Sequence, residues 1–341
     1  MSKHATIDEI ASACGVSSMT VSRVLRQTGR VNEETRKKVL VAAEKLHYLR
    51  STAQGRPRSL PSQPSPVAQI IIGSLEEMPP LYHLRLLVAV ERQFSRKGFD
   101  CLVHFTDGEY APFARMLESI RRTSGEVVVA IGNYPDDHLR SLACVHPGLI
   151  LLDSEAPGTL GNQCRSISFD NARAAALAVR HLARDAKRRK ILLLTGPRAY
   201  PFAREIEAGY CAALQENGLT FRPELLVRCD FSQNDAARQL EQALDRGVSF
   251  DAVFTNDEMA AAVYRVLVAH GFSIPDDISV CGCDNIPSGE QLHPELTTVS
   301  LPFDQLAEQA AELAVSDVLC RPYSLRLMPE LVVRHSTVRA E

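Results

Sequence analysis

The sequence predicts an α/β protein: a two-lobed body of parallel sheets flanked by helices, preceded by an N-terminal all-α helix-turn-helix domain. Three observations lead to this fold class. Residues 1–50 carry helical patterns, residues 51–66 are rich in Pro, Ser and Gly, and from residue 67 to residue 341 apolar runs alternate with amphipathic segments. Such alternation predicts parallel strands joined by helices. This region of about 270 residues is larger than a single sheet with its flanking helices usually is, so we expect two lobes.

The first and third helices of the head are predicted from their caps. Residues 6–9 (Thr-Ile-Asp-Glu) form a capping box, in which the Thr hydroxyl and the Glu carboxylate satisfy free N–H groups at a helix start. Gly15 then supplies a turn. Asn32 caps the third helix, and Glu33 and Glu34 occupy its first turn, where negative charge stabilises the helix dipole.

The second helix, which starts at residue 17 or 18, has two distinct faces. Val21, Val24 and Leu25 recur at helical spacing and form a buried stripe. The solvent-facing side presents Ser18, Met19, Ser22 and Arg23. Two short helices joined by a tight turn, with a third as support, form a helix-turn-helix, and the second helix of that motif enters the major groove of DNA. A protein-binding module built from three helices is the alternative.

Charge is unevenly distributed along the chain. Residues 1–60 hold 11 Lys and Arg and 5 Asp and Glu, a net charge of +6, although the whole chain has a net charge of −3. A basic head on an acidic body fits phosphate binding by the head alone.

Arg23 can donate two hydrogen bonds to guanine, Met19 can contact a thymine methyl, and Ser18 can bond to a base or a phosphate. The expected phosphate partners are Thr6, Ser17, Thr20, Ser22, Asn32 and Tyr48.

The body is predicted as a series of strands and helices. The expected strands are 67–73, 101–105, 127–131, 149–152, 190–195, 252–255 and 278–282. The expected helices are 81–97, 110–122, 136–143, 171–185, 202–217, 232–246, 257–270 and 303–319. Ligands of such folds bind at the carboxyl ends of the strands. Polar residues stand there at 170–171, 255–257 and 284, either as ligand contacts or as helix caps.

Several other functions are disfavoured. The sequence contains no nucleophile elbow, no HExxH motif and no dinucleotide or phosphate-binding glycine loop, so we expect no catalytic residues and no cofactor. Its ten His show no ligand spacing and its nine Cys form no CxxC pair, so we expect no metal site and reduced thiols in a cytoplasmic protein. No signal peptide and no apolar stretch of membrane-spanning length is recognisable.

The head also carries five ordered motifs of a known family. They are Ala5–Ala11 (ATIDEIA), Gly15–Ser17 (GVS), Thr20–Leu25 (TVSRVL), Val31–Arg36 (VNEETR) and Leu46–Tyr48 (LHY). In this respect the chain resembles the LacI/GalR family of bacterial transcriptional regulators. The resemblance implies that Ser18, Met19 and Arg23 read an operator. It also implies that the chain binds double-stranded DNA with pseudo-twofold symmetry as a homodimer, with a tetramer as the alternative.

The resemblance extends over the body. The matching segments are 168–171 (SFDN), 254–257 (FTND), 274–280 (IPDDISV), 282–287 (GCDNIP) and 296–299 (LTTV). The family's sensor is like a periplasmic sugar-binding protein, with an effector between two lobes joined by three crossovers. These should fall near 165–169, 294–301 and 324–328, with lobe one at 67–165 and 297–325 and lobe two at 166–296 and 326–341. The implied effector contacts are Leu75, Glu76, Asp170, Asn256 and Asp284.

Two cleft positions depart from the family pattern. The Arg that commonly precedes the Gly-aromatic pair by three residues is Ile206 here, with Arg204 nearby as a substitute, and the Gln after the Thr-Thr-Val segment is Leu301. Both changes make the expected sugar-facing side less polar. The effector is therefore expected to be a sugar or sugar acid, with a less hydroxylated ligand or no natural effector as alternatives. An enzyme on the same fold is a further, weaker alternative.

The linker departs as well. In the family a short helix here pushes a Leu into the minor groove and kinks the operator. The corresponding position is Pro57, preceded by Gly55, and neither suits a helix interior. Either Leu60 acts as a shifted wedge, or the linker forms no such helix and Arg56 and Arg58, together with the Arg at position 50, hold the DNA backbone electrostatically.

Overall fold

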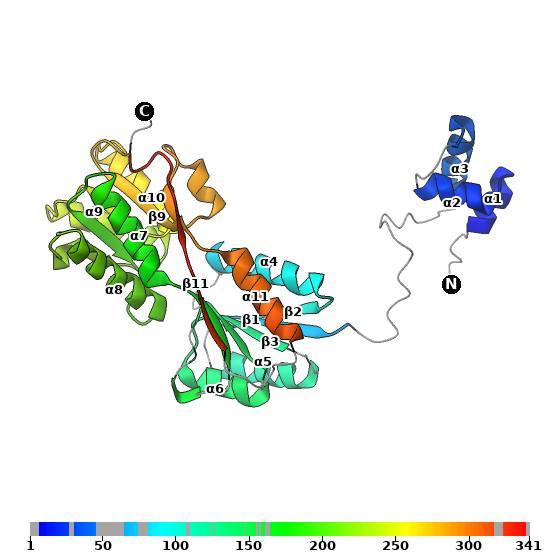
Figure 1. Cartoon of the computed structure of the whole chain (residues 1–341), viewed down its shortest axis with the longest axis horizontal. Coiled ribbons are helices and arrows are strands. Elements are labelled where there is room, and N and C mark those ends of the chain that lie inside the picture. Colours follow the sequence, from blue (N-terminus) through cyan, green and yellow to red (C-terminus); the bar gives the residue numbers. More distant parts are fainter. Residues whose placement is uncertain are drawn as a thin grey trace. The chain divides into compact units, whose positions relative to one another are not determined.

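In the computed structural model the chain forms two compact units, residues 1–64 and 65–341 (Figure 1). The described residues are 7–26, 31–45, 65–73, 81–106, 110–123, 125, 127–146, 148–154, 156, 158–160, 164–316 and 323–338. The predictions at Thr6, Tyr48, Arg56, Arg58, Leu60, Leu75 and Glu76 lie outside these residues.

The first unit contains three helices, α1 (Ile7–Cys14), α2 (Ser18–Arg26) and α3 (Glu33–Lys45). Gly15, with φ of +66°, forms the turn between α1 and α2. The apolar stripes of the three helices meet in one small core, formed by Ile10, Ala11, Val21, Val24, Val39 and Ala43. Val21 and Val24, both buried, belong to the stripe expected from periodicity. They hold α2 against the core, so that the side of the helix with Met19 and Arg23 is exposed to solvent.

The first lobe of the second unit is built on a sheet with the strand order β11-β5-β4-β3-β1-β2, in which every neighbouring pair is parallel. Its strands are β1 (Val67–Gly73), β2 (Asp100–Thr106), β3 (Val127–Gly132), β4 (Ile150–Leu152), β5 (Arg165–Phe169) and β11 (Tyr323–Leu327). Its helices are α4 (Leu81–Arg96), α5 (Tyr110–Thr123), α6 (Asp136–Val145), the short η1 (Gly158–Leu160) and α11 (Phe303–Val315).

The second lobe has the strand order β12-β10-β9-β8-β6-β7, and only the β10–β12 pair is antiparallel. Its strands are β6 (Ile191–Thr195), β7 (Leu226–Arg228), β8 (Ala252–Phe254), β9 (Ser279–Asp284), β10 (Thr297–Ser300) and β12 (Glu330–Val332). Its helices are α7 (Asn171–Arg184), α8 (Pro201–Glu216), α9 (Gln233–Asp245) and α10 (Asp257–Ala269), with the short η2 (Pro223–Leu225) and η3 (Pro287–Gln291).

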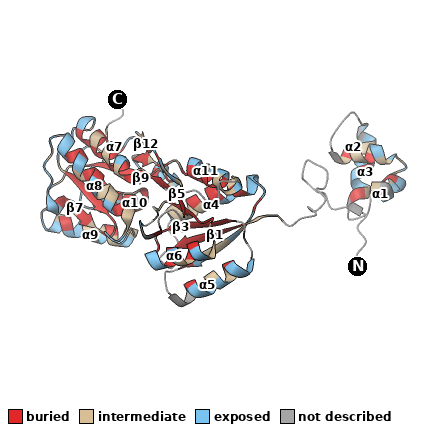
Figure 2. Ribbon diagram, turned by 60° about the horizontal axis from the view of Figure 1, so that its bottom comes forward, coloured by how far each residue is buried: buried red, intermediate tan, exposed pale blue. Residues whose placement is uncertain are grey.

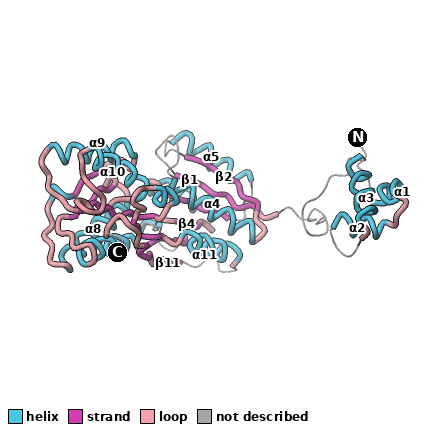
Figure 3. Tube along the Cα trace, turned by 90° about the horizontal axis from the view of Figure 1, so that it is seen from above, coloured by secondary structure: helices cyan, strands magenta, loops and turns pink. Residues whose placement is uncertain are grey.

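The central strands of each sheet are buried on both faces between layers of helices, which explains their largely apolar sequences (Figures 2 and 3). Along β1, Ile70 and Ile72 pack into the core shared with α4 and α11, whereas Ile71 packs with α5 and α6. In the second lobe, Leu193 belongs to the core shared with α7 and α8, and Leu192 to the core shared with α9 and α10. Alternate residues of one strand therefore face opposite helix layers.

The structure corrects the lobe boundaries. β5 lies in the first sheet, so residues 166–169 belong to lobe one, and β10 lies in the second sheet, so residues 297–300 belong to lobe two. The chain therefore crosses after Phe169, after Ser300 and after Leu327, at or beyond the ends of the expected windows. We also missed β5, β7, β10, β11 and β12 as strands, because they are only three to five residues long and lack the long apolar runs of the central strands.

Among the described residues, no helix is both long enough and apolar enough to span a lipid bilayer.

Candidate functional site: the exposed helix of the head and the interlobe cleft

The exposed side of α2 is the candidate DNA surface. Met19 is 65% exposed, an unusual state for a large apolar side chain, and Arg23 is also exposed. They stand four residues apart and so share one helix face. Ser18 and Ser22 on the same side are partly exposed. The face therefore combines a bidentate cation, an apolar contact and two hydroxyls, the groups that read base edges.

Two of the expected phosphate partners also have a structural task. The Ser17 hydroxyl oxygen accepts a hydrogen bond from the Thr20 N–H at 3.2 Å and pairs with the Thr20 hydroxyl at 2.9 Å. Asn32 Oδ1 accepts from the N–H of Glu34 at 2.9 Å. These side chains cap α2 and α3, so they fix the helix starts whether or not DNA is bound.

A cleft between the two lobes of the second unit is the candidate ligand site. It is lined at the carboxyl ends of strands from both sheets, where ligands bind in folds of this class. Strand-end residues on the first-lobe side include Gly73, Gly132 and Asp153, and those on the second-lobe side include Thr195, Thr255, Asp284 and Leu301, with Asn171 at the start of α7. The cavity has a volume of about 140 Å³.

Four of the residues expected at the cleft line it: Ile206, Asn256, Asp284 and Leu301. The Asn256 side chain also caps α10, since its Oδ1 accepts from the N–H of Met259 at 2.8 Å. Asp284 closes β9 with an unusual φ of +109°. Ile206 and Leu301 are the two apolar departures noted above, and they occupy the cleft wall together.

Two other expected contacts do not line the cleft. The Asp170 carboxylate accepts from the N–H of Arg173 at 2.9 Å and caps α7, and the cleft is lined by its neighbour Asn171 instead. Arg204 is exposed on α8, and its guanidinium donates to the carbonyl oxygens of Arg198 and Ala199 at 2.8 and 3.0 Å. It therefore does not replace the Arg that Ile206 removes.

The strongest features of the cleft were missed at the level of sequence. Asp153 follows a predicted strand directly, the same signal that selected Asp284, yet it was not singled out. Tyr82 of α4 lines the cleft as well, and its hydroxyl donates to Asp153 Oδ2 at 2.7 Å. Tyr200, Phe202 and Phe231 add an aromatic wall. Tyr200 and Phe231 lie in the loops after β6 and β7, and Phe202 lies in the first turn of α8; periodicity does not predict the course of these loops.

The cleft is electrostatically unusual because it buries several carboxyl groups. Burial raises the pKa of Asp153 to about 7, against the lowering effect of the Tyr82 hydrogen bond. Burial, and then the nearby carboxylates of Asp257 and Asp153, raise the pKa of Asp284 well above its usual range. Burial also raises the pKa of Glu258. These groups resist ionisation unless positive charge is brought close to them.

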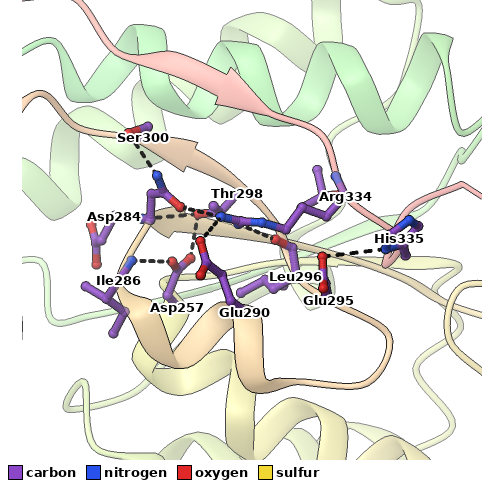
Figure 4. Close-up of polar contacts among 12 residues, drawn as sticks. Asp257, Asp284, Ile286, Glu290, Glu295, Leu296, Thr298, Ser300, Arg334 and His335 are labelled. Carbon is purple, nitrogen blue, oxygen red and sulfur yellow. Dashed lines mark hydrogen bonds and ion pairs between the residues drawn. The ribbon is translucent and has the colours of Figure 1, made fainter.

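A polar network holds the strand end that carries Asp284 (Figure 4). Asp257 is 1% exposed and accepts hydrogen bonds from the Thr298 hydroxyl at 2.6 Å and from the Ile286 N–H at 2.9 Å. Gly282 makes this possible, because a Cβ there would lie 2.0 Å from Asp257 Oδ1. Burial raises the pKa of Asp257 to about 7.

Arg334 completes this network from the C-terminal segment. Its guanidinium donates to Asn285 Oδ1 at 2.9 Å, to Glu290 Oε1 at 2.9 Å and to the Leu296 carbonyl oxygen at 2.8 Å. The Asn285 amide in turn donates to the Ser300 hydroxyl at 3.2 Å. The network is thus a support for the cleft wall, built from β9, β10 and the chain end (Figure 4).

Two contacts cross between the lobes beside the cleft. Arg85 of α4 donates to the carbonyl oxygens of Asp284 and Asn285, and its guanidinium lies 4.7 Å from the centre of the Phe303 ring. Arg326 of β11 pairs with Glu205 of α8 at 2.9 Å. These cations are engaged at the cleft margin and are not among the residues that line it.

Comparison with known proteins gives this arrangement its context. The profile of bacterial regulatory proteins of the lacI family matches residues 6–51, and that of periplasmic binding protein-like domains matches residues 179–337. The transcriptional regulator GalR of Escherichia coli is 30% identical over 97% of this chain and 95% of that protein. The chain belongs to the LacI family. As a LacI-family member it is a DNA-binding transcriptional regulator with a sensor domain.

Other relatives cover the chain equally fully. The ribose operon repressor of Bacillus subtilis is 28% identical over 99% of both chains, and the repressor PurR of Mannheimia succiniciproducens is 29% identical over 97% and 98%. Among solved structures, a complex of the regulator CelR with cellobiose matches with a TM-score of 0.71 at 24% identity, covering 97% of this chain and 99% of that one. The lac repressor dimer bound to operator and an anti-inducer matches with a TM-score of 0.68 at 24% identity, covering 99% and 100%.

Proposed function

We propose that this regulator represses transcription as a homodimer whose affinity for a pseudo-palindromic operator is set by a small molecule bound in the interlobe cleft. The observation that carries the DNA half is the exposed pair of Met19 and Arg23 on α2 of a LacI-family head. Ser18, Met19 and Arg23 contact base edges, while Ser17, Thr20, Ser22 and Asn32 contact phosphates. Thr6, Tyr48, Arg56 and Arg58, outside the described residues, are proposed as further backbone contacts. Such a protein works in the cytoplasm, where the chromosome is.

The test of the DNA half starts from a selection of binding sites from random duplex DNA by the full chain. Arg23→Ala should lower affinity for the selected site about 10- to 100-fold, since a bidentate contact to guanine contributes about 1–3 kcal/mol of discrimination. It should also relax preference at one base position in each half-site. Arg222→Ala removes an exposed Arg of the sensor and serves as the control.

The result that contradicts this half is simple to recognise. If the wild-type chain shows no salt-dependent preference for any selected sequence over random DNA, with or without metabolites, it does not read an operator through α2.

The cleft is proposed as the effector site, with Ile206, Asn256, Asp284 and Leu301 among its contacts. The support is its position at the strand ends and its two-lobed lining. A sugar-class effector fits the relatives, among them a ribose operon repressor and a cellobiose complex. We infer that the cleft binds without turnover. Following operator release and product formation together across a metabolite panel tests this, because turnover would indicate an enzyme.

The homodimer is proposed to form through one face of lobe one. Leu81 and Val88 of α4 and Phe105 of the edge strand β2 are large apolar side chains between 49% and 58% exposed. An exposed apolar patch on an edge strand and its neighbouring helix is typical of a subunit interface. The alternative of a tetramer is distinguished by the measured mass of the complex.

A further inference from the structure

One wall of the cleft is an aromatic cluster. Tyr200, Phe202 and Phe231 lie with their ring centres 5.4–5.5 Å apart in each pair, and all three line the cleft. Phe231 adopts a φ of +73°, which is costly for a residue with a bulky side chain. Its ring lies directly over Gly196, where a Cβ would stand 1.8 Å from Phe231 Cζ. The sequence thus gives up a side chain at position 196 and accepts backbone strain at 231 to place a third ring here.

The charged residues in the described lining of the cleft are all acidic. Asp153, Glu258 and Asp284 line the same cleft, and none of its described lining residues is a Lys or Arg. His83 is the one titratable base among these, and burial lowers its pKa to about 4, so it is neutral near pH 7. The described lining of the cleft therefore contains groups that can stabilise a positively charged ligand, and it contains no Lys or Arg to stabilise a negatively charged one.

Two buried polar atoms in the cleft have no hydrogen-bond partner among the residues that the structure describes. One is the hydroxyl of Thr255, a residue that is 2% exposed, and the other is Nδ1 of His83. A buried polar group without a partner costs about 1–3 kcal/mol, so such groups mark places where a missing molecule would be bound. Both residues line the cavity that also contains the carboxyl groups and the aromatic wall.

We propose that the effector of this regulator is a compact organic cation, a molecule of about monosaccharide size that carries a protonated amino group. This inference rests on the cleft being the effector site. The ammonium group is held by the faces of the rings at 200, 202 and 231 and by the carboxylates at 153, 258 and 284. The unpaired hydroxyl of Thr255 and ring nitrogen of His83 bond to polar groups on its body. An acidic sugar would face only like charge.

The experiment compares ligands that share one ring and differ in charge. Glucosamine, glucose and glucuronate, together with choline as a quaternary ammonium ion that lacks both the sugar ring and N–H donors, are titrated into the full chain at pH 7.5 by calorimetry and by thermal unfolding. Glucosamine or choline should bind at least about 10-fold more tightly than glucose, since a desolvated cation–π contact alone contributes about 2 kcal/mol. Glucuronate should show no binding.

Variants then locate the binding. Asp284→Asn keeps the shape and suits the positive φ, and Phe231→Leu removes a ring, so each should weaken cation binding about 10-fold or more. Asp245→Asn, an exposed carboxylate of α9, is the matched control and should bind like the wild type. Circular dichroism of each variant shows whether it is folded, and a misfolded Phe231→Leu leaves the Asp284→Asn comparison to decide.

Three results overturn the inference: glucose or glucuronate binding as tightly as the cations, neither cation binding, or the Asp284→Asn and Asp245→Asn chains binding a cation equally well. Operator affinity is measured in parallel. If a neutral sugar releases the operator, the proposed function stands and only the charge of the effector is wrong. If the chain binds no operator, the proposed function fails on its own evidence.

Discussion

Asp257 and Gly282 illustrate how a buried charge is accommodated at single-residue scale. The carboxyl group of Asp257 is enclosed by Thr298, by the backbone of Ile286 and by the space that Gly282 leaves open. None of these atoms lines the cleft, yet together they set the course of the chain just after Asp284. Substitutions here should act on the cleft through its support rather than through the ligand.

Replacing Gly282 by Ala should therefore destabilise the sensor. The new Cβ would meet Asp257 Oδ1 at 2.0 Å, and overpacking of this kind costs about 1–3 kcal/mol. Urea unfolding of the full chain measures the loss as a lower midpoint. Gly158→Ala is the control, since a Cβ at 158 meets nothing within 4 Å. Equal midpoints for the two variants would show that Asp257 moves aside without cost.

Sequence could select the strand ends but not the side chain that faces the ligand at each end. At 170–171 the first polar residue caps the helix and the second lines the cleft, whereas at Asn256 one residue does both. The choice depends on the local path of the turn, which spacing does not encode. Arg204 was misjudged for a similar reason, because a local pair of carbonyl oxygens at 198 and 199 binds its guanidinium.

Among the elements, α4 and β2 stand out because they are apolar on both sides. Leu86 and Val90 of α4 are fully buried, while Val88 between them is 54% exposed. Strand β2 lies at the edge of its sheet and exposes Leu102 and Phe105. In the described part of α5 no large apolar side chain is exposed. The proposed contact surface therefore consists of α4 and the edge strand.

Val88→Asp should convert the dimer to a monomer, because it places a charge in the middle of the proposed interface. Analytical ultracentrifugation gives the mass, and the affinity for a two-half-site operator should fall along with it. Val268→Asp, at a valine that is 62% exposed on α10, is the matched control and should leave the mass unchanged. A Val88→Asp chain that still sediments as a dimer would place the interface elsewhere.

The long central elements were predictable, and the short peripheral ones were not. β1, β3 and β6 are largely apolar runs, and the structure confirms them as strands. β7 and β12 have three residues each and become strands only because a neighbouring strand offers them hydrogen bonds. The lobe boundaries were misplaced by a few residues for the same reason, since β5 and β10 had not been recognised, although the chain crosses between the lobes at the expected windows.

At the scale of the whole sensor, the acidic groups around the cleft should make stability depend on pH. The groups that face Asp284 are Tyr82, His83 and Arg85 from α4, Asp153 after β4, and Asp257 and Glu258 from α10, with Cys283 beside it on β9. The carboxyl pKa values are raised, so the folded state retains protons that the unfolded state has lost.

Stability from these groups is present at low pH and lost as the pH rises through the folded pKa of about 7 for Asp153 and Asp257. The free energy of unfolding should fall by about 1–3 kcal/mol between pH 6 and pH 8. His83, whose pKa is lowered to about 4, opposes this only below its ordinary value near 6.5. Urea unfolding at both pH values measures the change, and Asp153→Asn should reduce it. A flat profile for the wild type would contradict the burial of ionisable carboxyl groups.

Arg85 directly connects the margin of the cleft to helix α4. Arg85 donates hydrogen bonds to the carbonyl oxygens of Asp284 and Asn285, and it lies on α4 less than one helical turn from Val88. A ligand that reorients those two peptide groups therefore acts on α4, whose exposed side carries the proposed subunit interface. Coupling between the ligand site and the proposed subunit interface therefore runs through a single helix and needs no chain of intervening residues.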